Sequence, residues 1–200
     1  DMYNPCALGS RLGILHTDLT EGLPPEIEGL HFHTLCESSA EALEKTLESF
    51  EARFGKYLHR LKWVNFGGGH LMTRNGYDVA HLIRIIRDFK SRYDLEVILE
   101  PGSAVAWQAG VLVSEVLDIV ENKGVKTAIV DVSFTAHMPD TLEMPYRPKI
   151  TGATDPVAGK PTYRIGGVSC LAGDFMYEYS FDKELEVGQK LIFEDMIHYT

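Results

Sequence analysis

A short apolar run ends in three consecutive glycines at Trp63-Val64-Asn65-Phe66-Gly67-Gly68-Gly69. Glycine has no Cβ, so such a turn exposes backbone N–H groups that can hold a phosphate. A tight turn with no ligand is the alternative for an isolated glycine triplet. The position after a strand and before a helix favours the phosphate interpretation.

The flanking segments alternate between helical and strand patterns. Residues 39–61 are expected to form an amphipathic helix, because apolar residues recur there at steps of three and four and Ser38 or Ser39 can cap it. A second helix is expected over 78–92, followed by a buried strand at 95–99. This alternation is typical of a parallel sheet or a (β/α) barrel.

The pattern changes near Ser103. The apolar residues between Val105 and Ile119 favour strand, and 127–130 predicts another buried strand. Two more strands are expected at 177–181 and 190–193, on either side of a turn. We expect loop over the Pro- and Gly-rich segment 145–167 and a mostly antiparallel β second half.

Two reactive side chains follow the glycine loop along the chain. Glu100 closes the strand at 95–99, where barrel enzymes keep working residues, and a carboxylate there can bond a pyridinium nitrogen. Cys170, with Asp174 nearby, is a candidate for chemistry on whatever the phosphate anchors. A surface acid and a buried thiol are the respective alternatives. With the glycines, these residues predict a phosphate-bearing cofactor.

His31 and His33 lie in a short apolar run. On a strand, both imidazoles would face the same way. A metal site with Cys36 is the less favoured interpretation because no second ligand cluster has suitable spacing, and no metal is predicted. An imidazole stacked on a cofactor ring is favoured over a plain strand histidine.

The bulk composition restricts the partners. The chain has 200 residues and a net charge of −10, with no basic stripe, so a nucleic acid or an anionic membrane is not an expected partner. Three widely spaced cysteines form no disulfide framework, which indicates a reducing compartment, and we expect the cytoplasm. No segment is apolar enough to span a bilayer, and Asp1-Met2-Tyr3-Asn4-Pro5 is not a signal peptide.

Longer stretches carry a family resemblance that covers essentially the whole chain. The sequence resembles the fold-type III, pyridoxal-phosphate-dependent decarboxylases of ornithine, diaminopimelate and related substrates. Within them it is most similar to the carboxynorspermidine (carboxyspermidine) decarboxylase family. The stretches that carry the resemblance are Gly29–His33, Asn65–Arg74, Glu100–Ser103, Asp131–Asp140, Leu142–Pro148, Ser169–Asp174 and Ile197–Thr200.

The resemblance implies a fold in two parts. Residues 1–103 would be the C-terminal half of a pyridoxal-phosphate-binding, alanine-racemase-like (β/α)8 barrel. Residues 104–200 would form most of a C-terminal antiparallel β domain. Neither end looks natural, and we expect a fragment that lacks the N-terminal half of the barrel and the C-terminal tail.

The resemblance also implies roles for single residues. His33 would stack on the pyridoxal ring, Gly67, Gly68 and Gly69 would bind its phosphate, and Glu100 would pair with the pyridinium nitrogen. Tyr199 would reach the phosphate from the β domain. Cys170 would come from the partner subunit of a homodimer with shared sites.

The substrate is implied by two departures from the diaminopimelate enzymes. Ser103 replaces an Arg that grips the distal carboxylate, and no acid follows Cys170 directly. Glu143 nearby suits a cationic polyamine arm instead, although a loop acid paired with Arg147 is its alternative. The remaining candidates for substrate contact are Gln108, Asp131 and Asp174.

The expected reaction is decarboxylation of carboxynorspermidine or carboxyspermidine to norspermidine or spermidine, in polyamine biosynthesis. No lysine here occurs in the context of the family's Schiff-base lysine, so this chain alone is expected to be inactive. One alternative is a decarboxylase of diaminopimelate or another basic amino acid. A non-catalytic pyridoxal-binding regulator is the other, and Cys170 and the β half argue against it.

Overall fold

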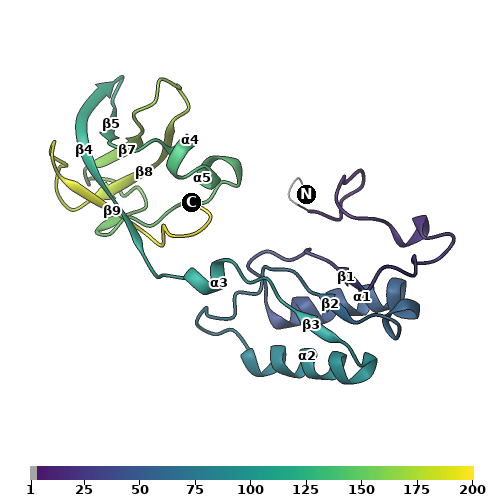
Figure 1. Ribbon diagram of the computed structural model, residues 1–200. Coiled ribbons are helices and arrows are strands. Elements are labelled where there is room, and N and C mark those ends of the chain that lie inside the picture. The colour runs from purple at the N-terminus through teal and green to yellow at the C-terminus, as the bar shows by residue number, and fades with distance from the viewer. Residues whose placement is uncertain (1–3) are drawn as a thin grey trace. The chain divides into compact units, whose positions relative to one another are not determined.

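The computed structural model describes residues 4–200. Residues 1–3, which begin the stretch judged above not to be a signal peptide, lie outside the described residues. The chain divides into two compact units, residues 1–105 and 106–200 (Figure 1). Each unit has a hydrophobic core of its own.

The first unit is a three-stranded parallel sheet with helices between its strands (Figure 1). Its sheet order is β1-β2-β3, so neighbouring strands follow one another along the chain. After a short 3₁₀ helix, η1 (His16–Asp18), the elements are β1 (Gly29–His31), α1 (Ala40–Leu58), β2 (Trp63–Asn65), α2 (Val79–Tyr93) and β3 (Glu96–Ile98). The predicted β/α alternation is confirmed, and the bounds of α1, β2, α2 and β3 lie within three residues of the predicted ones.

Local signals set the two helices. Ser39 caps α1 by accepting a hydrogen bond from Ala42 N, and Asp78 caps α2 in the same way from His81 N. The helix α1 ends at Leu58, earlier than predicted, and Leu61 reaches the core from the turn that follows. The buried faces of both helices share one core with the sheet residues Val64 and Phe66.

The second unit is a six-stranded sheet in the order β6-β8-β7-β5-β4-β9. All its pairs are antiparallel except β5 with β7, so the prediction of a mostly antiparallel second half is confirmed. The strands are β4 (Val111–Asn122), β5 (Val125–Val130), β6 (Ala153–Thr154), β7 (Thr162–Gly166), β8 (Phe175–Phe181) and β9 (Lys190–Glu194). Two single-turn helices, α4 (Phe134–His137) and α5 (Asp140–Glu143), follow β5.

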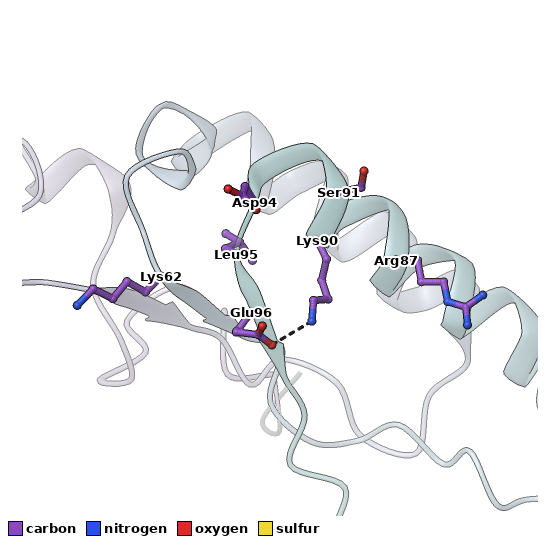
Figure 2. A pocket seen from close by; sticks show the side chains of 7 residues that line it. All are labelled: Lys62, Arg87, Lys90, Ser91, Asp94, Leu95 and Glu96. Carbon is purple, nitrogen blue, oxygen red and sulfur yellow. Dashed lines mark hydrogen bonds and ion pairs between the residues drawn. The ribbon is translucent and has the colours of Figure 1, made fainter.

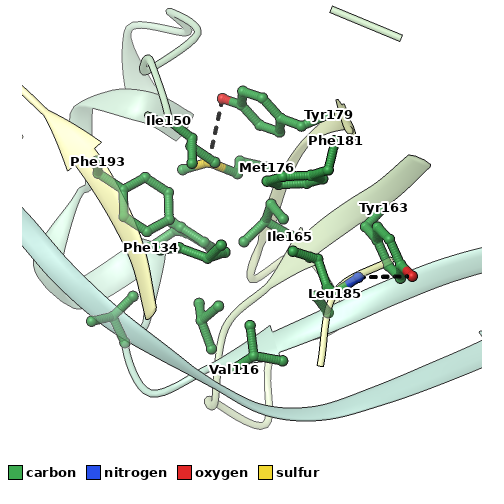
Figure 3. Close-up of a cluster of buried hydrophobic side chains, with 14 of the residues drawn as sticks. Val116, Phe134, Ile150, Tyr163, Ile165, Met176, Tyr179, Phe181, Leu185 and Phe193 are labelled. Atoms are coloured by element: carbon green, nitrogen blue, oxygen red, sulfur yellow. Dashed lines mark hydrogen bonds between the residues drawn. The ribbon is translucent and has the colours of Figure 1, made fainter. Parts of the chain in front are cut away.

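The long strand β4 organises this sheet. Its first half pairs with β9 and its second half with β5, through a hairpin whose turn residues Lys123 and Gly124 both have positive φ. Side chains from β4, β5, β7, β8 and β9 meet in one core (Figure 3). Phe134 from α4 is fully buried in that core.

Two sequence-based predictions of secondary structure were wrong. Residues 103–110 are not strand: they form α3 (Ser103–Ala106) and a turn in which Gln108 has φ 53°. Val105 is 79% exposed, so its strand propensity had no burial to reinforce it. The segment 145–167 is not only loop, because β6 and β7 lie in it. Tyr163 and Ile165 alternate into the core there, a pattern masked by the neighbouring Pro and Gly residues.

Two further observations concern compartment and membrane. Within residues 4–200, no helix combines the length and the apolar character needed to cross a bilayer. None of the three cysteines in the same part of the chain forms a disulfide.

Candidate functional site

The carboxyl ends of the three parallel strands place the predicted residues of the first unit together. His33 lies two residues after β1, and Glu100 lies two residues after β3. The glycine loop begins at Gly67, two residues after β2. Carboxyl ends of neighbouring parallel strands meet at one edge of a sheet, which is where ligands bind in such folds. The structure therefore places His33, the glycine loop and Glu100 at the same edge of the sheet.

The backbone around the glycine loop is too close to admit side chains. A Cβ on Gly67 would lie 2.4 Å from the Phe32 carbonyl oxygen, and one on Gly69 would lie 2.1 Å from that of Leu35. Gly67 and Gly69 also have φ values of +70° and +80°, which side chains rarely adopt. A Cβ on Gly68 would meet the Glu100 carbonyl oxygen at 2.6 Å. Each of the three positions therefore requires glycine.

Asn65 is a functional candidate that the sequence reasoning missed. Its side-chain oxygen accepts a hydrogen bond from Gly67 N at 2.8 Å, and its Nδ2 donates to Glu100 Oε1 at 2.7 Å. The side chain therefore links the glycine loop to the carboxylate from inside the protein, where Asn65 is 9% exposed. The available signal was a polar residue inside an otherwise apolar strand, directly ahead of the glycines.

Hydrogen bonds within the protein limit which glycine N–H groups of this loop could bind a phosphate. Gly67 N is engaged by Asn65, and Gly68 N donates to His33 Nδ1 at 3.3 Å. Two of the three glycine amides thus have partners within the protein. Phosphate binding by this loop stays a prediction.

Both histidines lie near the same carboxylate, although β1 ends at His31 and His33 lies beyond the strand predicted to hold the pair. His31 Nε2 lies 3.4 Å and His33 Nδ1 3.9 Å from Glu100 Oε2. The three side chains are about half exposed, at 47%, 54% and 47% for His31, His33 and Glu100. They form an open, polar group that a ligand can reach from solvent.

His70 follows the glycines and was not singled out from the sequence as a site residue. It is 1% exposed, and neither ring nitrogen has a hydrogen-bond partner. Burial lowers the pKa of His70, and the backbone groups of Phe66 and Gly67 offset only part of that effect. The lowered pKa favours the neutral form of this buried ring.

In the second unit, Cys170 lies on an exposed loop that Asp174 holds in shape. The buried Asp174 carboxylate accepts hydrogen bonds from Phe134 N at 2.7 Å and Ser169 N at 3.0 Å. Burial alone would raise the pKa of Asp174, but hydrogen bonds from Ser169, Phe134 and Ser133 outweigh it and the pKa is lowered. The carboxylate thus organises the loop that presents the exposed thiol of Cys170.

The other predicted residues of this unit occupy its surface. Asp131 is exposed directly after β5, and hydrogen bonds from Ser114 and from the Glu115 backbone lower its pKa. Glu143 ends α5 and Tyr199 is 66% exposed. Gln108 does not extend a strand as predicted, and its backbone N donates to Asp195 Oδ1 at 2.6 Å.

Arg147, the alternative partner proposed for Glu143, pairs with another acid. Its Nε lies 2.9 Å from Asp155 Oδ1. The guanidinium also stacks 4.0 Å from the centre of the Tyr179 ring. These contacts indicate a structural role for Arg147, since Tyr179 belongs to strand β8.

A separate hollow in the first unit lies at the opposite ends of the strands. Lys62 directly precedes β2 and Glu96 begins β3, whereas the glycine loop and Glu100 follow these strands. Figure 2 shows Lys90 on α2 paired with Glu96 across this hollow, at 3.0 Å. Its lining residues are Lys62, Arg87, Lys90, Ser91, Asp94, Leu95 and Glu96. We therefore place the candidate site at the glycine loop and not here.

Comparison with known proteins identifies relatives over the whole chain. The family model for the C-terminal sheet domain of pyridoxal-dependent decarboxylases matches residues 56–197. A carboxyaminopropylagmatine decarboxylase of Synechocystis sp. is 55% identical over 100% of this chain and 52% of its own length. A carboxynorspermidine/carboxyspermidine decarboxylase of Campylobacter jejuni is 48% identical over 100% of this chain and 55% of its own length.

A solved structure agrees with these relatives. The crystal structure of carboxynorspermidine decarboxylase from Campylobacter jejuni, complexed with norspermidine, superimposes with a TM-score of 0.88 and 48% identity. The match covers 98% of this chain and 56% of the other. The chain thus spans about half the length of the curated relatives it matches.

Proposed function

Since this chain belongs to the pyridoxal-dependent decarboxylase family, we propose that its full-length protein removes CO₂ from a carboxylated polyamine, using pyridoxal 5′-phosphate. The observation that carries the proposal is the cluster of His33, Glu100 and the glycine loop in a chain 48–55% identical to two such decarboxylases. The proposed substrates are carboxynorspermidine and carboxyspermidine, and the products norspermidine and spermidine. Diaminopimelate is the rival substrate.

A second candidate substrate is carboxyaminopropylagmatine. The Synechocystis relative named for it is 55% identical, against 48% for the Campylobacter protein. An agmatine arm ends in a guanidinium and a norspermidine arm in an ammonium. Both are cationic, and both are compatible with the exposed acids Asp131 and Glu143.

The residues of the first unit suit the proposed cofactor. The Glu100 carboxylate accepts a hydrogen bond from Asn65. It would keep a proton on the pyridine nitrogen of the bound ring. His33 would stack on the ring, and the loop Gly67–Gly69 would bind its phosphate through backbone N–H groups. Protonated pyridoxal phosphate supplies an electron sink for the electrons left when CO₂ departs.

The residues of the second unit would serve the substrate. Asp131 and Glu143 would attract the cationic arm, with Gln108 as a neutral hydrogen-bonding partner, and Tyr199 would reach the cofactor phosphate. Cys170 would deliver a proton near the reacting carbon from the partner subunit of a homodimer. Asp174 would act mainly through the Cys170 loop.

We also propose the architecture and the compartment of the full-length protein. Residues 1–103 would belong to a (β/α)8 barrel completed by the rest of the full-length protein, and 104–200 to its β domain. The lysine that holds the cofactor would come from outside this chain. We propose a cytoplasmic enzyme, on the argument from the cysteines given above.

The experiment that tests the function uses the full-length protein. It should take up pyridoxal phosphate with a visible absorbance band that borohydride alters. Values of kcat/KM should then be measured for carboxynorspermidine, carboxyspermidine, carboxyaminopropylagmatine and diaminopimelate. We expect one of the three carboxylated polyamines to exceed diaminopimelate by roughly ten- to a hundred-fold, the value of one charge-assisted contact. A preference for diaminopimelate would contradict the substrate, and a colourless protein would contradict the whole proposal.

A mutation tests the role of Cys170. Cys170→Ala should lower kcat far more than it raises KM, as expected for a group that acts in the transition state. Cys6→Ala removes another exposed thiol and should have no effect. Mixing Cys170→Ala subunits with subunits that lack the cofactor lysine should restore part of the activity. If exchanging subunits show no rescue, each site is built within one chain.

A further inference from the structure

His31, His33 and Glu100 together resemble a ligand set for a metal ion. Two imidazoles and one carboxylate are the donors of the 2-His-1-carboxylate group that binds divalent transition metals. One ligand atom from each residue lies within 4.8 Å of the others. We propose that, when pyridoxal phosphate is absent, these three side chains bind one Zn²⁺ ion, which then blocks uptake of the cofactor.

The distances support an ion of this size. Zn–N and Zn–O bonds of about 2.0–2.2 Å place neighbouring tetrahedral ligands roughly 3.3 Å apart. His31 Nε2 and Glu100 Oε2 are separated by 3.4 Å, and His33 Nδ1 and the same oxygen by 3.9 Å. Small side-chain rotations would bring all three atoms to a common ion. The half-exposed side chains leave room for one or more waters to complete its coordination.

Two contacts prepare the ligands. Asn65 donates to Glu100 Oε1 at 2.7 Å, so the carboxylate is oriented while Oε2 faces the histidines. Gly68 N donates to His33 Nδ1, which places a lone pair on that nitrogen. A metal needs this unprotonated nitrogen, and it would replace a long hydrogen bond of 3.3 Å.

The competition with the cofactor rests on the proposed function, because His33 and Glu100 are assigned to both ligands. His31 is assigned only to the metal. A substitution at His31 therefore separates metal binding from cofactor binding. His31 is also half exposed, so its replacement should leave the fold intact.

The test is a calorimetric titration of ZnCl₂ into the full-length protein stripped of its cofactor. His31→Gln should weaken the binding of one Zn²⁺ by roughly 100-fold or more, since loss of even an outer-shell partner costs ten- to a hundred-fold. Saturation with pyridoxal phosphate should prevent the binding of that ion. Melting curves of His31→Gln verify that the variant is folded. His33→Gln is a second variant that removes one of the three ligands.

The matched control is His81→Gln. His81 on α2 belongs to the other group of candidate ligands in the described chain, with Glu41 on α1 and Asp78, which caps α2. Its replacement should leave the cofactor-sensitive Zn²⁺ site unchanged. Unchanged Zn²⁺ affinity in His31→Gln, or loss of the competing ion in His81→Gln, would overturn the proposal. A protein that binds Zn²⁺ through His31 but takes up no pyridoxal phosphate would refute the proposed function and leave the metal site standing.

Discussion

Replacing Glu100 with Gln is expected to lower kcat of the full-length enzyme by roughly 100- to 1,000-fold, the typical cost of removing one electrostatic contact to a transition state. A neutral amide cannot hold the proton on the pyridine nitrogen, so the bound ring becomes a poorer electron sink. Cofactor uptake should remain largely intact, because the loop Gly67–Gly69 and His33 are unchanged. The measurements are single-turnover rates and the cofactor dissociation constant.

Asn65 provides the companion experiment. Asn65→Ala removes both hydrogen bonds, to Gly67 N and to Glu100, and should also slow turnover. If Asn65 acts through the carboxylate, the effects of Asn65→Ala and Glu100→Gln should be non-additive, with a coupling of about 1 kcal/mol or more. The exposed Asn75 is the control, and Asn75→Ala should leave turnover unchanged. Turnover of Glu100→Gln equal to that of the wild type would return Glu100 to the role of a surface acid.

The second large effect is expected at Gly69. Gly69→Ala places a Cβ 2.1 Å from the Leu35 carbonyl oxygen at a φ of +80°. Left-handed strain costs about 1–2 kcal/mol, and overpacking against backbone adds about 1–3 kcal/mol. We expect a comparable loss in the free energy of unfolding and a weaker affinity for the cofactor, measured by denaturant titration and by absorbance.

Gly76 is a matched control for that substitution. It has a φ of +84°, but a Cβ there would meet nothing within 4 Å. Gly76→Ala should therefore show only the cost of the left-handed conformation. Equal destabilisation by the two substitutions would mean that the loop yields to the new methyl group, contrary to the geometry described here.

The sequence predicted the first unit well because its signals are local. Helix periodicity, the serine cap of α1 and the short apolar strands all act within a few residues of each other. The second unit was harder, since β7 pairs with the distant strand β5 as well as with the next strand β8, and Gly and Pro residues surround it. At residues 103–110, strand-forming side chains occur without burial, and a helical turn forms instead.

In the candidate site, too, only the residues marked by a local pattern could be predicted from the sequence. His33, the glycines and Glu100 could be proposed from the sequence because each lies in or just after a short apolar run. The roles of Asn65 and His70 depend on which groups lie next to them in space. Asn65 meets a carboxylate thirty-five positions along the chain, at a separation that no local pattern encodes.

The pairing of β4 with both β5 and β9 has a consequence for the order of folding. In the first unit, each strand pairs with the next strand along the chain, so its sheet can grow as the polypeptide leaves the ribosome. In the second unit, the first half of β4 pairs with β9, the last strand of the unit. Such distant pairing slows folding, because a long loop must close before any contact rewards it. During synthesis, the edge of β4 should therefore stay exposed until β9 emerges, which makes this strand the segment most in need of protection by a chaperone.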